Sequence, residues 1–173
     1  MDIMLLGEKT LRVKGKNSSA VINPTSTIGK TEADAILELE KYPDSTDSKV
    51  NGTRIIINGP GEYEVGGMKY SVVGVSGKLV TKIDTDSLKL LVGSGEVIEK
   101  IQDKVENCDI AVINADSGFN YSVLTSLEPR VLIVYGDKKD EVAKSLGKSS
   151  EKITKFSTTQ DKLPSEMQFV LLG

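Results

Sequence analysis

The sequence predicts an α/β fold in which two mixed β-sheets, or one mixed sheet, pack against helices. Short apolar runs separated by turn residues fill the first 93 residues, as is typical of consecutive strands. After residue 94, helical spacing of apolar residues alternates with continuous apolar runs that indicate buried strands. The length of 173 residues suits a single domain over 1–173.

The first half is expected to consist of strands and turns. KNSSA (16–20) is typical of a hairpin turn, and the polar stretches 23–33 and 41–52 are expected to be loops. DAILELE (34–40) is ambiguous, and its short length favours a strand over a helical turn. The other expected strands are DIMLLG (2–7), TLRVKG (10–15), AVINP (20–24), RIIIN (54–58), EYEVGG (62–67), MKYSVVGVSG (68–77), KLVTKIDTD (78–86) and SLKLLVG (87–93).

The stretch NGPGEYEVGG (58–67) combines glycines with two glutamates and could be taken for a site. Proline fixes one φ and glycine is free to take a positive φ, so Gly59-Pro60-Gly61 predicts a turn. Glu62 and Glu64 then lie on the same, solvated side of a strand. Gly66-Gly67 before the next apolar run is a hairpin signal. We therefore expect this stretch to build the fold.

The second half is expected to alternate strands and helices. A helix is predicted over 94–108, with Ser94 or Gly95 as its N-cap, from apolar residues at helical spacing. A short helix is predicted over 118–127, ending before Pro129, and a third over 140–148, closed by Gly147. The expected strands of this half are CDIAVINAD (108–116), RVLIVYG (130–136), KITKFS (152–157) and MQFVLLG (167–173).

Composition excludes several classes of function. A formal charge of −3, 5% aromatic residues and no tryptophan argue against a nucleic-acid surface. No apolar run is long enough to span a bilayer, and MDIMLLGEKTLRV lacks the basic start of a signal peptide. The single cysteine, Cys108, forms no internal disulfide and suits a reducing compartment, so we expect a cytoplasmic protein without membrane contact.

The chain contains no histidine, which removes the commonest general base and the commonest metal ligand. Catalysis by serine–histidine or cysteine–histidine pairs is excluded. Zinc would have to be held almost by carboxylates alone, which it rarely accepts, whereas magnesium or calcium on oxygen ligands stays open.

Four places could carry chemistry, and each has a simpler interpretation. GSGEV (93–97) could bind phosphate at a helix start, but it lacks the third glycine, so a tight turn is expected. Asp116-Ser117 ends a strand and could form a functional loop or cap the next helix. Cys108 has no basic neighbour in sequence, so an inert thiol is expected. A solvated edge is the simpler interpretation of the carboxylates Asp34, Glu38, Glu40 and Asp44.

The order of these segments resembles the metallo-β-lactamase-fold hydrolases, in particular their small bacterial and archaeal branch. INGPGEYEVGGMKYSVVGV (57–75) is the most distinctive match. The supporting matches are DIMLLGEKTLRVKGKNSSAVINP (2–24), EADAILE (32–38), LKLLVGSGE (88–96), CDIAVINAD (108–116), LEPRVLIVYG (127–136) and DKLPSEMQFVLL (161–172). The resemblance implies a reduced metallo-β-lactamase-like αββα sandwich, with two mixed β-sheets flanked by helices.

The resemblance also locates the family's metal ligands, and this chain lacks them. The family's histidine–x–histidine–x–aspartate–histidine motif falls on EKYPDS (40–45), where only the aspartate is kept. The next histidine and the bridging aspartate fall near Leu91 and Ser94, and the last histidine near Gly136. The vestigial site positions are therefore Glu40, Tyr42, Asp44, Ser45, Leu91, Ser94 and Gly136. We expect no metal and no cofactor there.

The resulting expectation is a non-catalytic pseudo-hydrolase that binds an unidentified protein partner or assembles as a homo-oligomer. One alternative is a hydrolase with a rebuilt carboxylate site, in which Asp44, Glu38, Glu40 and Asp116 hold a hard cation. The other alternative is a small-ligand sensor that uses the vestigial cleft near Tyr42, Ser94 and Gly136.

Overall fold

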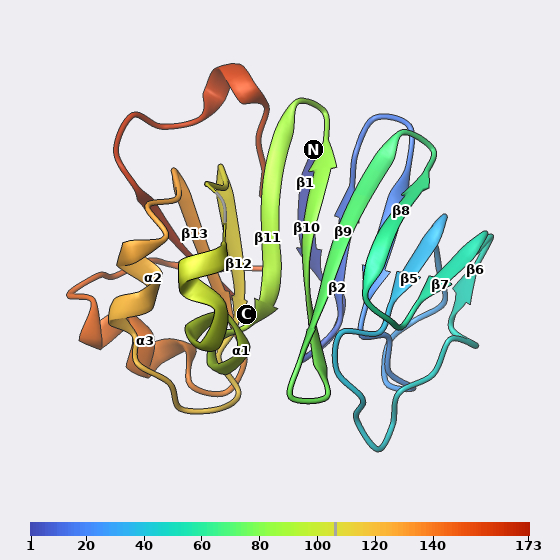
Figure 1. Ribbon diagram of the computed structural model, residues 1–173, viewed down its shortest axis with the longest axis horizontal. Coiled ribbons are helices and arrows are strands. Elements are labelled where there is room, and N and C mark those ends of the chain that lie inside the picture. Colours follow the sequence, from blue (N-terminus) through green and yellow to red (C-terminus); the bar gives the residue numbers. More distant parts are fainter. Residues whose placement is uncertain (106) are drawn as a thin grey trace.

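Two mixed β-sheets pack face to face in the computed structural model, which describes residues 1–105 and 107–173 (Figure 1). The smaller sheet has the strand order β15 (Lys155–Ser157), β1 (Asp2–Leu5), β2 (Leu11–Lys14), β3 (Ser19–Ile22), β5 (Ala35–Leu37), β7 (Ile55–Ile57). The larger sheet has the order β14 (Lys152–Ile153), β16 (Gln168–Leu172), β13 (Val131–Tyr135), β12 (Ile110–Asn114), β11 (Leu88–Ser94), β10 (Lys78–Thr85), β9 (Met68–Val75), β8 (Gly61–Val65).

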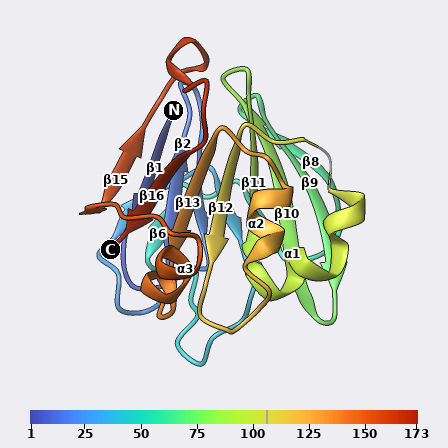
Figure 2. The same ribbon diagram turned by 90° about the vertical axis from the view of Figure 1, so that its left-hand side faces the viewer.

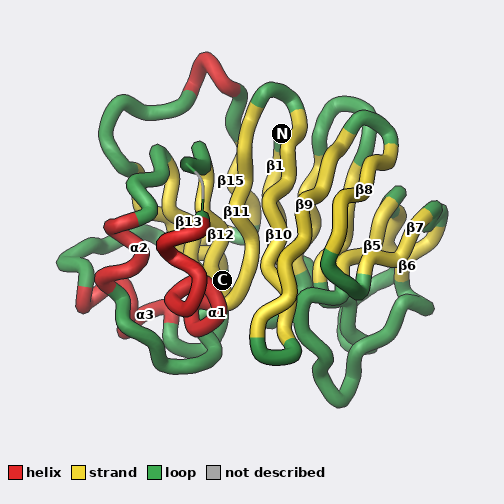
Figure 3. Tube along the Cα trace, viewed as in Figure 1, coloured by secondary structure: helices red, strands yellow, loops and turns green. Residues whose placement is uncertain are grey.

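The strands of both sheets are the yellow segments of the tube in Figure 3. The main core consists of side chains from both sheets. Alternate residues of each strand point inward, so Leu11 and Val13 of β2 meet Tyr70 of β9 and Leu90 of β11 in one cluster. Strands β11, β12, β13 and β16 run parallel and are almost wholly buried, because both of their faces are covered. Their continuous apolar runs follow from this burial.

The described helices lie against the outer face of the larger sheet (Figure 2). Helices α1 (Gly95–Ile101), α2 (Ser122–Ser126) and α3 (Lys139–Ser145) bury Val97, Leu124 and Val142 against that face. Short 3₁₀ turns lie at Gln102–Lys104 and Gln160–Lys162. On the outer face of the smaller sheet, a two-stranded sheet of β4 (Thr31–Glu32) and β6 (Val50–Asn51) contributes Val50 to a small cluster. The predicted sandwich of two mixed sheets is confirmed.

Two predicted helices are shorter than the sequence indicated. The helix expected over 94–108 ends at Ile101 and continues as a 3₁₀ turn, and Glu106 of that prediction lies outside the described residues. Ser94 is the N-cap of α1, but its hydroxyl makes no cap hydrogen bond. The helix expected from Gly118 begins only at Ser122, so Asp116 and Ser117 do not cap it. Asn120 instead accepts hydrogen bonds from the Ser122 backbone N–H and hydroxyl.

Several local predictions are confirmed. DAILELE forms the strand β5 rather than a helical turn. Gly147 closes the region of α3 with φ +61°, and Lys148 donates to the carbonyl of Ala143. Gly66 and Gly67 have φ +59° and +80° between β8 and β9, the geometry of a two-residue hairpin. The stretch NGPGEYEVGG is thus a turn, an edge strand and a second turn, with exposed glutamates. Among the described residues, no helix is long and apolar enough to cross a membrane.

The β10–β11 hairpin supplies a first testable prediction. Asp86 and Ser87 occupy its turn with φ +52° and +63°, a backbone region that costs a non-glycine residue about 1–2 kcal/mol. Replacing Ser87 by glycine is expected to raise the free energy of unfolding by about 0.5–1 kcal/mol, the strain relief exceeding the entropy cost of glycine. Denaturant unfolding measures it. Ser165→Gly, at an exposed site without positive φ, is the control, and no gain over this control would contradict the prediction.

Candidate functional site

Polar side chains gather at one rim of the sandwich, where parallel strands of the larger sheet end. Ser94, Asn114 and Tyr135 are the last residues of β11, β12 and β13 and are paired side by side in register. Each continues the alternation that points inward to the other sheet, and each is buried. The carboxyl ends of parallel strands are a common place for ligand sites in α/β folds. This rim is therefore the candidate functional site.

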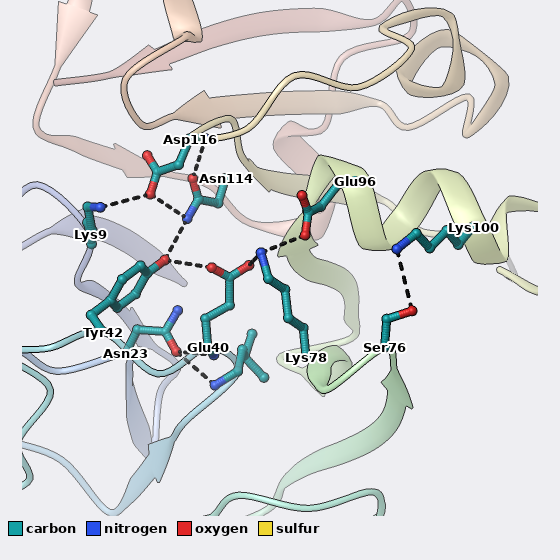
Figure 4. A network of polar contacts seen from close by, with 11 residues as sticks. Lys9, Asn23, Glu40, Tyr42, Ser76, Lys78, Glu96, Lys100, Asn114 and Asp116 are labelled. Atoms are coloured by element: carbon teal, nitrogen blue, oxygen red, sulfur yellow. Dashed lines mark hydrogen bonds and ion pairs between the residues drawn. The ribbon is translucent and has the colours of Figure 1, made fainter.

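The smaller sheet contributes a turn that is fixed by Asn23. This asparagine follows β3 with φ +50°, and its side-chain oxygen accepts the backbone N–H groups of Leu39 and Glu40 at 2.8 and 3.0 Å. Ser45 Oγ accepts the N–H of Tyr42 at 2.8 Å, which tightens the next turn. The two turns direct Glu40 and Tyr42 toward the larger sheet (Figure 4).

The side chains of the two sheets meet in one hydrogen-bonded network (Figure 4). The hydroxyl of Tyr42 donates to Glu40 Oε2 at 2.9 Å and accepts from Asn114 Nδ2 at 3.0 Å. Asn114 Nδ2 also donates to Asp116 Oδ2 at 3.2 Å, while its carbonyl oxygen accepts the Asp116 N–H. Asp116 Oδ1 accepts the N–H of Asp137, which follows β13. The network therefore joins the ends of β5, β12 and β13.

Two lysines supply the positive charge at this rim. Lys78, the first residue of β10, places its ammonium 2.6 Å from Glu96 Oε1 and 3.4 Å from Glu40 Oε1. Lys9, between β1 and β2, lies 3.4 Å from Asp116 Oδ2 and 4.7 Å from the centre of the Tyr42 ring. Glu40 is the least exposed of these carboxylates, with a side-chain accessibility of 10%. Each of the three carboxylates thus has an ammonium partner.

The electrostatics keep the lysine charged and the tyrosine neutral. Burial lowers the pKa of Lys78, but its hydrogen bond to Glu96 and the charges of Glu40 and Glu96 outweigh this and raise the pKa overall. The hydrogen bond from Lys78 lowers the pKa of Glu96. Burial, followed by the charge of Glu40, raises the pKa of Tyr42 well above its ordinary value. Near neutral pH, Lys78 cannot act as a base and Tyr42 cannot act as a phenolate.

The vestigial positions are only partly brought together. Glu40 and Tyr42 belong to the network, Ser45 orders its turn, and a Cβ on Gly136 would lie 2.5 Å from Asp116 Oδ1. Ser94 lies beside Asn114, and its buried Oγ has no described hydrogen-bond partner. Asp44, by contrast, is exposed, and its carboxylate makes no described contact. Leu91 packs in the helix-side cluster, on the face opposite to the network.

The rebuilt carboxylate site is not assembled either. Glu40 and Asp116 share the network, but Asp44 and Glu38 make no described side-chain contact with it. In the described part of the chain, no group of three or more cysteine, aspartate or glutamate side chains is arranged to hold a metal ion. The ammonium groups of Lys9 and Lys78 stand against the carboxylates that would serve as ligands. The residues of this rim therefore do not fit a metal centre.

Sequence reasoning missed five residues of the network. Asn114 carried a usable signal, because it is the one amide that interrupts the buried run of β12 at its carboxyl end. Asn23 precedes a proline after an apolar strand and carried a weaker signal. Isolated lysines and glutamates usually indicate solvated surface, so the charged residues of the network carried no usable signal in the sequence. The missed residues are Lys9, Asn23, Lys78, Glu96 and Asn114.

Cys108 lies away from the network, and its thiol is unreactive. It is buried next to β12 in the helix-side cluster. Burial, with a smaller contribution from the charge of Asp109, raises the pKa of its thiol to about 11. The thiolate is the nucleophilic form, so this residue is not a nucleophile near neutral pH.

Comparison with solved structures defines the class of fold. A candidate Zn-dependent hydrolase of the metallo-β-lactamase superfamily from Thermotoga maritima superimposes with a TM-score of 0.78 at 18% identity, covering 99% of this chain and 98% of that one. A candidate metal-dependent hydrolase from Parabacteroides distasonis gives 0.65 at 15% identity, covering 96% and 91%. Zn²⁺-bound PqqB from Methylobacterium extorquens gives 0.63 at 10% identity, covering 91% and 100%.

The chain therefore has the metallo-β-lactamase fold, as its sequence resemblance implied. No protein-family model matches the sequence, and no curated protein matches it either. The TM-scores of 0.63–0.78 establish the shared fold, whereas identities of 10–18% do not carry over an activity, which has to be argued from the site itself.

Proposed function

We propose that this chain is a non-catalytic protein of the metallo-β-lactamase fold that acts by binding polypeptide, and in the first instance a second copy of itself. The claim that the chain is non-catalytic rests on the ion pairs at the rim. Lys78 pairs with Glu40 and Glu96, and Lys9 pairs with Asp116. A metal ion would have to displace charges that already belong to the protein. A reducing cytoplasmic setting fits the single buried thiol of Cys108.

The free edge of the smaller sheet supports the claim that the chain binds another polypeptide. β7 is the last strand of that sheet. Ile55 donates to Asp34 and Ile57 accepts from Glu38, so the N–H and C=O of Ile56 point away from β5, toward the open edge. The Ile56 side chain is 42% exposed, which is unusual for a large apolar residue in the described part of this chain. An exposed apolar edge is a site for pairing with another strand.

A second copy fits this edge better than it fits the edge of the larger sheet. Antiparallel pairing about a two-fold axis would place Ile56 opposite its own copy, where both exchange N–H···O bonds, with Arg54 opposite Asn58. The same operation on β8 would set Glu62 opposite Glu64, and like charges in that arrangement are destabilising. The lack of such like-charge repulsion therefore favours β7. The short strand implies a weak dimer, seen at roughly micromolar to millimolar concentrations.

Replacing Ile56 by lysine tests the edge. Sedimentation velocity over a concentration series is expected to show the wild type moving toward a dimer, and Ile56→Lys staying monomeric, because an edge lysine blocks strand pairing. Val73→Lys, at the exposed valine of β9, is the control and should dimerise as the wild type does. A wild type that stays monomeric, or an Ile56→Lys variant that still dimerises, would contradict dimer formation through β7. If a different protein were found bound at β7, that protein rather than a second copy would be the partner.

The claim that the chain is non-catalytic needs a separate test. The purified chain, with Zn²⁺, Mn²⁺ or Mg²⁺ added, would be assayed against ester, thioester and phosphodiester substrates. The expected result is no turnover above the metal-containing buffer. Saturable turnover that is abolished by Glu40→Gln or Asp116→Asn would overturn the proposal in favour of a rebuilt hydrolase.

Small-ligand binding is a second candidate, favoured by one cavity. A cavity of about 370 Å³ adjoins the network at Glu40 and Lys78, rather than among Tyr42, Ser94 and Gly136. Its wall carries the carboxylate of Glu38 and the ammonium of Lys41, neither of which has a described side-chain partner. Opposite charges suit a zwitterionic small molecule. Thermal shift against amino acids tests it, since a ligand of the native state raises the melting temperature.

A further inference from the structure

An arginine without an acidic neighbour lies on the outer face of the smaller sheet. The residues before and after Arg12 in β2 point into the main core, so Arg12 points outward, between Met4 of β1 and Val21 of β3. Asp2 of β1, on the same face, is already paired with Lys155 at 2.7 Å. The row of residues that crosses this face contains no carboxylate and reads Lys155, Met4, Arg12, Val21, Ile36 and Ile56.

Part of the Arg12 guanidinium is shielded from solvent. Its Nε atom is buried and has no hydrogen-bond partner among the residues that the structure describes. The side chain as a whole is partly buried, and its terminal nitrogens make no described hydrogen bond or ion pair. Burial of a charged group without a partner costs free energy. An anion that docks on the open side of the guanidinium would offset that cost.

Arg12 lines a surface depression of about 460 Å³ that extends to the β4–β6 pair. The β4–β6 side carries the ammonium of Lys30, the hydroxyl of Thr31 and the side-chain amide of Asn51, none of which has a described side-chain partner. Glu32 also lines the depression, and its carboxylate forms no described ion pair with Arg12 or Lys30. The depression thus combines two cations and two neutral donors with a single carboxylate.

We propose that this depression binds a phosphate monoester, with the phosphate group against Arg12 and Lys30. A guanidinium binds two phosphate oxygens through parallel N–H groups, and a group with a charge close to −2 matches two cations. The hydroxyl of Thr31 and the amide of Asn51 can donate to the remaining oxygen. Glu32 would repel a second phosphate and can accept a hydroxyl from the rest of the molecule, so a small polar monoester fits better than a polyphosphate.

Titration of the wild type with glycerol 3-phosphate, inorganic phosphate and acetate, followed by NMR at constant ionic strength, tests the site. We expect glycerol 3-phosphate to give saturable shifts of the backbone amide signals of Thr31 and Asn51, with a dissociation constant of about a millimolar. Inorganic phosphate should bind more weakly, because it offers no hydroxyl-bearing chain to Glu32. Acetate, with one charge and two oxygens, should bind at least about tenfold more weakly than glycerol 3-phosphate.

Two substitutions on β2 separate the site from general surface charge. Arg12→Met keeps most of the side-chain stem and removes the charge, so it should weaken binding at least about tenfold. Lys14→Met is the matched control, because Lys14 lies on the same face of β2 but is exposed and does not line the depression. It should change the affinity less than about twofold. If Arg12→Met does not fold, Lys30→Met at an exposed site replaces it, with an expected loss of about fivefold.

Thermal unfolding gives a second measure. Phosphate stabilises proteins in general by being excluded from their surface, so the wild type is compared with Arg12→Met at each concentration. At ten times the dissociation constant, the melting temperature of the wild type should rise by about 2–4 °C more than that of the variant.

Saturable shifts at Thr31 and Asn51 that Arg12→Met weakens, and Lys14→Met does not, support the site. The proposal is overturned by the lack of saturable shifts, by an equal loss in both variants, or by equal rises in the melting temperatures of the wild type and Arg12→Met. Binding of inorganic phosphate or acetate as tight as that of glycerol 3-phosphate would likewise exclude a monoester. The site lies on a different face from the rim, so dimer formation and hydrolytic turnover leave this result unaffected.

Discussion

Replacing Gly136 by alanine is expected to lower the free energy of unfolding by about 3 kcal/mol. Gly136 has φ +99°, where an L side chain is strained. A Cβ would lie 2.5 Å from Asp116 Oδ1, 2.7 Å from Asn114 Oδ1 and 3.1 Å from the backbone carbon of Ala115. The first two atoms belong to the network and the third is backbone, so relief requires the rim to rearrange. Urea unfolding measures this loss, provided that the slope m of the unfolding free energy against urea concentration is the same in the wild type and the variant.

Gly147→Ala separates strain from crowding in that experiment. Gly147 also has a positive φ, of +61°, but no atom lies within 4 Å of the position that a Cβ would take, so only backbone strain is added. Its loss should be about 1 kcal/mol. A Gly136→Ala loss no larger than that of Gly147→Ala would show that the carboxylate and amide at the rim are not held as described.

Removing the amide of Asn23 is the second change with a large expected effect. Asn23→Ala leaves the N–H groups of Leu39 and Glu40 without their acceptor in a buried place, and sets alanine at φ +50°. Each of the two unsatisfied groups costs about 1–3 kcal/mol and the backbone about 1 kcal/mol, so a total loss of at least about 3 kcal/mol is expected. Denaturant unfolding again measures the loss.

Two comparisons identify the origin of the Asn23 effect. Asn23→Gly removes the backbone strain and should recover about 1 kcal/mol relative to alanine. Asn120→Ala also deletes an acceptor of two hydrogen bonds, but at an exposed site where water replaces it, so its loss should stay below about 1 kcal/mol. Equal losses for Asn23→Ala and Asn120→Ala would contradict the role of Asn23 in fixing the Glu40 turn.

Most of the fold could be predicted from the sequence because its strands carry strong local signals. The buried run of β12, the alternation of β10 and the glycine pair between β8 and β9 each identify an element without tertiary information. The helix ends were less predictable. Apolar spacing continued through Val105 although α1 stops at Ile101, because Val105 packs on the helix-side cluster from a non-helical segment. Tertiary packing there overrode the local pattern.

The candidate site could be located but not described in advance. Alignment to the resembled family placed Glu40, Tyr42 and Gly136 at the rim, and the structure brings these three positions to the network. The same alignment kept Asp44 as the one surviving metal ligand, but the side chain of Asp44 is exposed. Lys78 and Lys9 come from segments far away in sequence, and their pairing with Glu96 and Asp116 depends on the sheet topology. Charge pairing of this kind leaves no periodic or motif signal in a single sequence.

The central claim is that internal ammonium groups, and no metal ion, neutralise the carboxylates of this rim. Its most direct test is the zinc content of the wild type after dialysis against excess Zn²⁺ and removal of free metal, measured by plasma mass spectrometry. We expect no stoichiometric zinc, and we expect the side-chain amide signal of Asn114 to be the same in NMR spectra recorded with and without Zn²⁺. Stoichiometric zinc that shifts the Asn114 signal would contradict it.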